Sequence, residues 1–146
     1  MADEIRRIAV NTGGGDAPGL NAVIRSIVLS ARRRGWDVLG IRRGYAGLFD
    51  TSKILQLDAD SVRGITHLGG TILGTTNKND PFNFPLLVPG EEPRTVDRSD
   101  EIIENFRRLK IDALIAIGGD GSMRIASRLS EKGVPIIGVP KTIDND

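Results

Sequence analysis

The spacing of apolar residues changes several times along the chain, and these changes predict alternating strands and helices. A short β-branched run, Ile5–Thr12, stops at three consecutive glycines and predicts a strand that enters a tight turn. After Pro18 the apolar residues recur every three or four positions as far as Ala31, which is typical of an amphipathic helix. We expect Asp16 to cap this helix, Pro18 to lie in its first turn, and Asp37–Ile41 to form a second strand.

The second half of the chain repeats this alternation. Two short apolar runs, Ala113–Ile117 and Ile136–Val139, are typical of strands that are buried on both faces. A helix is expected after Asp97 or Ser99, and another is expected over Ser122–Lys132. The predicted fold class is therefore α/β, with a doubly wound, mostly parallel sheet and helices on both faces.

The middle of the chain has weaker patterns. Arg42–Asp60 contains too many glycines for a helix and is predicted to be a loop that leads into a short strand at Ile54–Leu57. Ser61–His67 is expected to form a short helix. Four prolines within Asn79–Pro93 indicate an exposed excursion rather than a core element. Because the chain stops in a polar segment shortly after a strand, we expect residues 1–146 to be one amino-terminal domain of a longer protein.

Composition excludes several classes of function. The chain has 146 residues, with 39% apolar and 27% charged residues, which is enough apolar material for a packed core. Its 20 basic and 19 acidic residues leave a formal net charge of +1, so there is no electrostatic argument for nucleic acid. The absence of cysteine excludes disulfides and thiolate metal sites and is compatible with a cytoplasmic protein. No segment has the length and apolarity of a membrane helix.

Three polar loops directly follow predicted strands, at Gly13–Gly19, Gly118–Ser122 and Pro140–Asp146. In a parallel sheet such loops converge on one crevice. The glycines of the first loop allow the backbone to approach a phosphate, and the helix that follows offers free N–H groups. The loop matches neither the Walker A pattern nor the dinucleotide fingerprint. A glycine turn with only a structural role is the alternative.

Acidic residues lie in the other two loops. Asp120 stands among glycines at a predicted helix start, where it is either a Mg²⁺ anchor or a helix cap. Asp144 and Asp146 follow Lys141 and Thr142, and their spacing directs both carboxylates to one side of an extended segment. A solvated loop is the simpler interpretation. Three carboxylates in one crevice would repel one another unless a cation or proton transfer were involved, which favours phosphoryl transfer to a hydroxyl.

Five motifs, in this order and spacing, make the chain resemble the 6-phosphofructokinase family. They are GGDAPGLNAVIR, GYAGL, GGTILGT, IGGDGS and PKTIDND. The resemblance extends over nearly the whole chain but covers only the amino-terminal part of that enzyme. It implies transfer of a phosphoryl group from Mg·ATP to the 1-hydroxyl of fructose 6-phosphate. It also implies a homotetramer as the complete protein.

The resemblance implies roles for particular residues. The donor would be bound by Gly15, Tyr45, Gly119, Asp120, Gly121 and Ser122, with Asp120 acting through Mg²⁺. The sugar phosphate would be bound by Thr142, Ile143 and Asp144, with Asp144 as the base that accepts the hydroxyl proton and Asp146 in support. The family usually has arginine near the end of the GTILGT loop, where this chain has Asn77 and Lys78. Arg25 matches an effector-site arginine of the family.

The identity of the donor depends on Gly121 and Lys141. In the family that this chain resembles, ATP users have glycine at both positions, whereas pyrophosphate users tend to have aspartate at position 121 and lysine at position 141. Because an aspartate at position 121 would obstruct the α-phosphate of ATP, the glycine there favours ATP. A pyrophosphate-dependent phosphofructokinase is the alternative enzyme, and a non-catalytic nucleotide-binding regulatory module is the alternative of another class. The 146 residues alone are expected to bind phosphates weakly and to be inactive or nearly so.

Overall fold

One five-stranded sheet forms the centre of the molecule. The computed structural model describes residues 4–15, 17–76 and 80–141. The strands run in the spatial order β3-β2-β1-β6-β7, and all neighbours are parallel except β3, which is antiparallel to β2. The mostly parallel sheet predicted from the sequence is thereby confirmed. The strands are β1 (Arg7–Thr12), β2 (Asp37–Ile41), β3 (Ile54–Leu57), β6 (Ala113–Gly118) and β7 (Ile136–Pro140).

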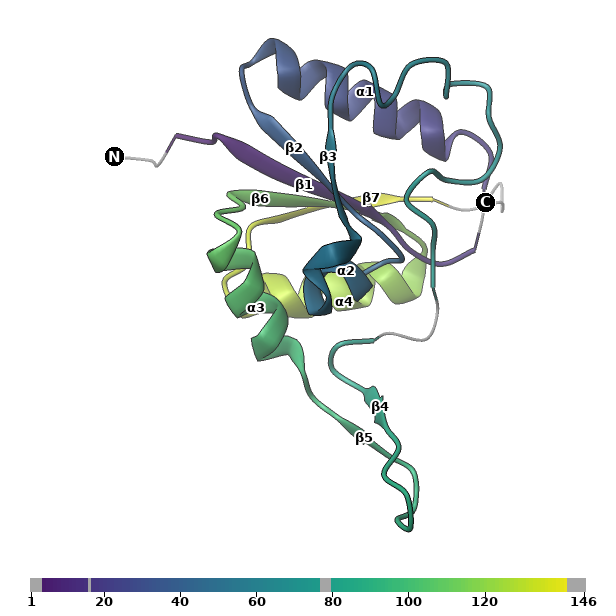
Figure 1. Ribbon diagram of the computed structural model, residues 1–146, viewed down its shortest axis with the longest axis vertical. Coiled ribbons are helices and arrows are strands. Elements are labelled where there is room, and N and C mark those ends of the chain that lie inside the picture. Colours follow the sequence, from purple (N-terminus) through teal and green to yellow (C-terminus); the bar gives the residue numbers. More distant parts are fainter. Residues whose placement is uncertain (1–3, 16, 77–79, 142–146) are drawn as a thin grey trace.

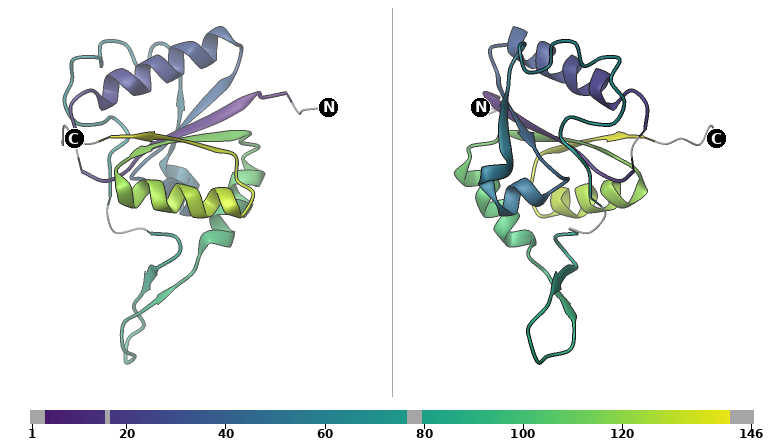
Figure 2. Two further views of the ribbon diagram at one scale, coloured as in Figure 1. Left: turned by 180° about the vertical axis from the view of Figure 1, so that it is seen from behind. Right: turned by 45° about the vertical axis from the view of Figure 1, so that its right-hand side comes forward.

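Helices cover both faces of this sheet, as Figures 1 and 2 show. Side chains alternate along β1, so that Ile8 and Val10 face α1 (Leu20–Arg33) while Ala9 faces the opposite side. The opposite face packs against α2 (Ala46–Phe49), α3 (Ser99–Arg108) and α4 (Asp120–Glu131). The molecule therefore has two apolar cores, one on each face. None of the helices among the described residues is long and apolar enough to cross a membrane.

The first helix begins later than the sequence predicted. Gly19 is its N-cap, in the left-handed conformation with φ 91°, so Pro18 precedes the helix instead of lying in its first turn. The expected cap, Asp16, lies outside the described residues. At the other end of the helix Gly35 has φ 76° and donates its N–H to the Arg32 carbonyl oxygen at 3.0 Å, as is common where a helix stops.

Two short helical turns occupy the segment that was predicted to be a loop. α2 is followed by a 3-10 helix at Thr51–Lys53, and only then by the strand β3, whose predicted bounds are correct. Glycine lowers helix propensity, but at Gly47 it is required by packing: a Cβ there would lie 2.9 Å from Ile41 Cγ2. The loop prediction was wrong because a tertiary contact, and not local helix propensity, explains why glycine stands at this position of the helix.

The predicted helix at Ser61–His67 is absent, and residues 60–67 form turns instead. Asp58 and Ser61 bond to each other's backbone: the Ser61 N–H donates to Asp58 Oδ1 at 2.9 Å, and the Asp58 N–H donates to Ser61 Oγ at 2.8 Å. Gly64 then takes a left-handed conformation with φ 73°. These side-chain bonds compete with helix formation and favour a turn.

The proline-rich segment projects away from the sheet as a two-stranded ribbon (Figures 1 and 2). β4 (Phe84–Leu86) pairs antiparallel with β5 (Arg94–Val96), which confirms the excursion but adds two strands that the sequence did not predict. Its base is fixed by Arg98, whose guanidinium lies 4.3 Å from the ring centroid of Phe49 and 4.4 Å from that of Phe84.

The remaining elements lie close to their predicted positions. α3 buries Ile102, Ile103 and Phe106, and at its start Asp97 Oδ1 accepts the Ser99 N–H at 2.8 Å. α4 begins at Asp120, two residues before the predicted start. Asp120 is therefore the first helical residue and not the cap.

Candidate functional site

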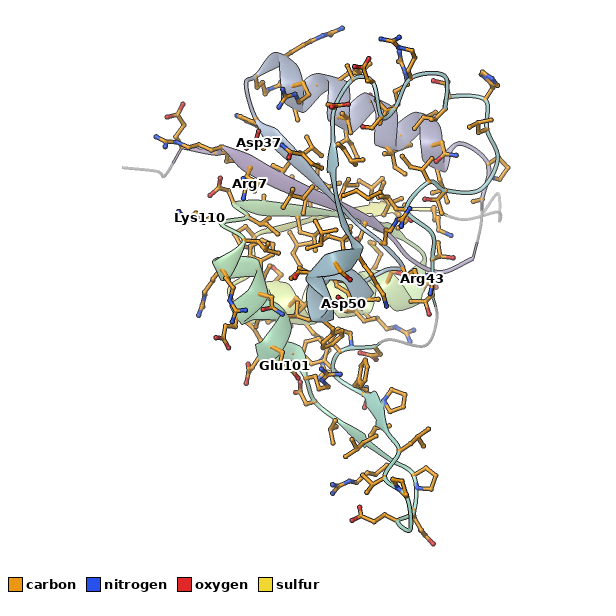
Figure 3. The ribbon with its side chains drawn as sticks, in the orientation of Figure 1. Arg7, Asp37, Arg43, Asp50, Glu101 and Lys110 are labelled. Atoms are coloured by element: carbon orange, nitrogen blue, oxygen red, sulfur yellow. The ribbon has the colours of Figure 1, made fainter. Side chains whose placement is uncertain are left out.

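A cleft of about 400 Å³ opens at the carboxyl ends of β1, β2 and β6. This is the end at which a parallel α/β sheet binds ligands. Figure 3 labels Arg43 at this end of the sheet, while Arg7, Asp37 and Lys110 mark the opposite end. The lining residues come from the carboxyl ends of β1 and β6, from loops and from α4; they are Asn11, Gly13, Gly14, Gly44, Tyr45, Thr76, Asp80, Ala116, Ile117, Gly119, Asp120, Gly121, Ser122 and Ile125.

The first two predicted loops meet at Ser122. The Gly13 N–H donates to the Ile117 carbonyl oxygen at 2.8 Å, which continues the pairing of β1 with β6 past the strand end. A Cβ on Gly13 would overlap Ser122 Oγ, and a Cβ on Gly118 would overlap Ser122 Cβ. Glycine at both positions is therefore a packing requirement, and it allows the two backbones to approach each other beside the cleft.

The amino end of α4 faces the cleft. Its N-cap is Gly119, which makes no side-chain capping bond, and Asp120, Gly121 and Ser122 form its first turn. The first N–H groups of a helix have no partner within the helix, and this end carries the positive end of the dipole. A Cβ on Gly121 would meet no other atom within 4 Å, so the space beside it is open.

Lys141 connects the third loop to the first. Its N–H donates to the Gly118 carbonyl oxygen at 2.9 Å, and its Nζ donates to the Gly15 carbonyl oxygen. Gly14, in the left-handed conformation with φ 76°, lies beneath this ammonium group. The convergence of these loops was expected from the sequence. Four predicted residues of the third loop, Thr142, Ile143, Asp144 and Asp146, lie outside the described residues.

The buried tyrosine lies at the β2 side of the cleft. Tyr45 is only 5% exposed, and its hydroxyl makes no hydrogen bond to any described residue. Burial raises the pKa of Tyr45 well above its ordinary value; the negative charge of Asp80 adds to this, and the nearby Asn11 amide opposes it. The phenol is therefore neutral at physiological pH.

The GGTILGT segment is held against the strand ends by polar contacts. Thr12 Oγ1 donates to the Gly74 carbonyl oxygen at 2.9 Å, and the Arg43 N–H donates to the Leu73 carbonyl oxygen at 2.8 Å. The buried Asn21 of α1 accepts the Ile72 N–H at 2.8 Å. Thr76, just after this segment, and Asp80 both line the cleft. Asn77 and Lys78, which lie between them, are outside the described residues.

Sequence reasoning missed several lining residues. Asn11 lies at the end of β1 and donates Nδ2 to the Gly44 carbonyl oxygen at 3.1 Å, and Asp80 and Ile125 also line the cleft. Asn11 carried a usable signal, since it is a polar residue at the carboxyl end of an apolar strand. Arg25 of α1 is not among the residues that line the cleft.

The fold and the three converging loops can be compared with known proteins. Residues 7–146 match the family model described as Phosphofructokinase. This chain belongs to the phosphofructokinase family. The resemblance noted in its sequence motifs is thereby confirmed over nearly the whole chain.

Named phosphofructokinases share almost half of their aligned residues with this chain. ATP-dependent 6-phosphofructokinase 1 of Nostoc sp. is 49% identical over 97% of this chain, and ATP-dependent 6-phosphofructokinase 2 of Clostridium perfringens is 48% identical over all of it. A pyrophosphate–fructose 6-phosphate 1-phosphotransferase of Dictyoglomus thermophilum is 45% identical over 96%. The chain spans 39%, 40% and 37% of the length of these three relatives.

Solved structures give the same fold. Phosphofructokinase of Pichia pastoris in the T-state superposes with a TM-score of 0.82 at 28% identity, over 98% of this chain and 16% of that one. A pyrophosphate-dependent phosphofructokinase of Marinobacter aquaeolei superposes with a TM-score of 0.74 at 22% identity, over 97% of this chain and 34% of that one. At that identity the second match supports the fold alone.

Proposed function

We propose that the complete protein transfers the γ-phosphoryl group of Mg·ATP to the 1-hydroxyl of fructose 6-phosphate, giving fructose 1,6-bisphosphate. The observation that carries this proposal is the meeting of two glycine loops and a helix amino end around a cleft, in a chain of the phosphofructokinase family. Residues 1–146 are the amino-terminal, donor-binding domain in this proposal. The remaining sugar-phosphate ligands belong to parts of the protein that this chain does not contain.

In this proposal the donor phosphates bind to the backbone of the two glycine loops and to the amino end of α4. Gly15, Gly119, Asp120, Gly121 and Ser122 supply this surface, and free N–H groups at the start of α4 attract the negative charge. Lys141, which directly follows β7, adds an ammonium group at the same place. Phosphoryl transfer needs mainly positioning and charge neutralisation, which backbone N–H groups and a cation supply together.

The chemistry of the site fits Mg²⁺. Asp120 is exposed on the first turn of α4, lines the cleft, and is not used as a helix cap. Mg²⁺ keeps several waters and binds through one or two carboxylates and the substrate's phosphates, so a single carboxylate at the cleft is sufficient to hold it. When bound, the ion would offset the charge of the phosphates, and Asp120 would hold it.

Asp144 is the proposed base that accepts the proton of the sugar hydroxyl. Thr142 and Ile143 contact the sugar phosphate, and Asp146 supports the base or the metal. Lys141, the residue before this segment, donates its Nζ to the Gly15 carbonyl oxygen of the first glycine loop, and this contact supports the assignment. Lys78, beside Asn77, replaces the arginine that the family usually has, and it supplies charge without a two-pronged guanidinium.

ATP is the proposed donor because of Gly121. The space beside this residue is open, so a nucleotide's α-phosphate can pass, whereas an aspartate would project a negative charge into the same space. The names of the relatives at 49% and 48% identity agree with ATP. Lys141 and the relative from Dictyoglomus thermophilum favour the second candidate, a pyrophosphate-dependent enzyme. A homotetrameric state, a cytoplasmic location and an effector role for Arg25 are further proposals that rest on the family resemblance alone.

The test is phosphorylation of fructose 6-phosphate by the full reading frame, extended past Asp146, with Mg·ATP and Mg·pyrophosphate in parallel. We expect activity with ATP, and a loss of at least about tenfold in kcat/KM for ATP in Gly121→Asp through like-charge repulsion. Gly69→Asp is the matched control, since a side chain at this exposed glycine also meets nothing within 4 Å, and it lies outside the cleft.

Two results would contradict the proposal. A preference for pyrophosphate in the unmodified enzyme would transfer the deciding role from Gly121 to Lys141. Undiminished transfer in Asp144→Ala would show that Asp144 is not the base that accepts the hydroxyl proton.

A further inference from the structure

The cleft has a second polar end, separated from the glycine loops. Tyr45 lies beyond the end of β2, and Asp80 lines the cleft near it, whereas Gly119–Ser122 follow β6, and β1 lies between these two strands. Neighbouring strands are about 4.8 Å apart, so the two ends are separated by about 10 Å. A ligand with phosphates on the glycine loops would extend its other end toward Tyr45 and Asp80.

The hydroxyl of Tyr45 indicates that this end binds a polar group. It is buried, lines the cleft, and has no hydrogen-bond partner among the described residues. A buried polar group without a partner is unfavourable in the free protein and is relieved when a ligand supplies the partner. Because the raised pKa keeps the phenol neutral, it offers an O–H donor to an acceptor atom of the ligand.

Asp80 provides a fixed acceptor beside this donor. Its Oδ1 accepts the Phe82 N–H at 2.9 Å, and its Oδ2 accepts Asn83 Nδ2 at 3.3 Å. These two bonds orient the carboxylate within its own turn. Each carboxylate oxygen accepts more than one hydrogen bond, so the group retains capacity toward the cleft.

We propose that Asp80, paired with Tyr45, selects the base of the phosphoryl donor and favours adenine over 6-oxopurines. The exocyclic amino group of adenine donates to the Asp80 carboxylate, and a ring nitrogen of adenine accepts from the Tyr45 hydroxyl. Guanine and hypoxanthine carry a carbonyl oxygen in place of the amino group, and two acceptors facing each other repel. This inference rests on the proposed function, and it adds a specificity-determining residue to the donor site.

The test compares four ligands by titration calorimetry on the protein of the full reading frame, extended past Asp146: Mg·ATP, Mg·GTP, Mg·ITP and Mg·tripolyphosphate. We expect ATP to bind at least about tenfold more tightly than GTP or ITP, since a hydrogen bond to a charged group is worth a factor of this order. Asp80→Asn replaces one acceptor oxygen with an NH₂ donor suited to the 6-carbonyl. It should abolish most of the ATP preference and leave tripolyphosphate binding unchanged.

Asp50→Asn is the matched control. Asp50 also caps a turn two residues ahead, with Oδ1 accepting the Ser52 N–H at 3.1 Å, but it lies outside the cleft. Equal thermal unfolding temperatures for the two variants will show that Asp80→Asn folds normally.

Two results would overturn the inference while leaving the donor site in place. One is equal binding of the three nucleotides by the unmodified chain. The other is an Asp80→Asn variant that weakens or strengthens all four ligands by the same factor. Failure of every ligand to bind, tripolyphosphate included, would instead contradict the donor site itself and with it both proposals.

Discussion

The close approach of the two glycine loops at Ser122 gives a prediction that can be worked out atom by atom. A methyl group added at Gly118 would lie more than an ångström closer to Ser122 Cβ than the ordinary carbon–carbon separation of about 3.5 Å. A methyl group added at Gly13 would overlap mainly Ser122 Oγ, with Ser122 Cβ farther away at 3.3 Å. Neither glycine has a positive φ, so the cost of each substitution is steric.

The two substitutions should differ in cost for a structural reason. Ser122 Cβ is fixed by the backbone of α4, whereas Oγ can rotate away. Overpacking typically costs 1–3 kcal/mol. We therefore expect Gly118→Ala to lower the free energy of unfolding by about 3 kcal/mol and Gly13→Ala by about 1 kcal/mol. In a Ser122→Ala background the cost at Gly13 should nearly disappear, and the cost at Gly118 should remain.

Urea unfolding, followed by circular dichroism and by the fluorescence of the single tryptophan, measures these free energies. Gly121→Ala is the control, because its methyl group meets no other atom within 4 Å and alanine favours a helix. Its stability should stay equal or rise by up to about 1 kcal/mol. The close approach of the two loops at Ser122 would be refuted if Gly118→Ala were as stable as Gly121→Ala, or if Ser122→Ala restored the stability of Gly118→Ala.

Three further predictions concern other parts of the molecule. Tyr45→Phe removes a buried hydroxyl without a partner among the described residues, so it should raise the free energy of unfolding by about 1 kcal/mol in chemical denaturation; a loss of stability would contradict the unpaired state. The N–H groups of Arg6 and Arg7, which donate to Asp112 Oδ2 at 2.8 and 2.9 Å, hold the pKa of Asp112 below its unfolded value. The contribution of Asp112 to the free energy of unfolding is therefore present above pH 4 and lost as the pH falls through its folded pKa. Asp112→Asn should be less stable than the unmodified chain by about 1 kcal/mol at pH 7 and equally stable near pH 2. A stability difference that does not depend on pH would refute this linkage. Arg98→Ala removes the cation that contacts both phenylalanine rings at the base of the ribbon, and hydrogen exchange should then accelerate in residues 84–96 but not in the central sheet; equal acceleration in both would show that the ribbon is not anchored there.

The sequence was sufficient for the features that depend on local pattern. The apolar runs of β1, β6 and β7 and the periodicity of α1 and α3 predicted the sheet and its two helical layers. Because parallel strands end on one side, the meeting of the glycine loops followed from the order of elements alone.

The features that the sequence missed depend on tertiary contacts. α2 contains Gly47, which local propensity disfavours and which packing against β2 requires. The turns after Asp58 replace a predicted helix because side-chain bonds satisfy the backbone there. The relation between Tyr45 and Asp80 joins residues far apart in the chain, and no local pattern encodes it.

The most direct test of the donor site is a map of backbone N–H chemical shifts in the ¹⁵N-labelled chain during titration with Mg·ATP and with Mg·pyrophosphate. With ATP we expect shifts at Gly13, Gly14 and Gly119–Ser122 together with Tyr45, and with pyrophosphate shifts at the glycine loops but not at Tyr45. Shifts confined to another surface, such as the groove lined by Ile103, Phe106 and Val134, would contradict a donor site in the cleft.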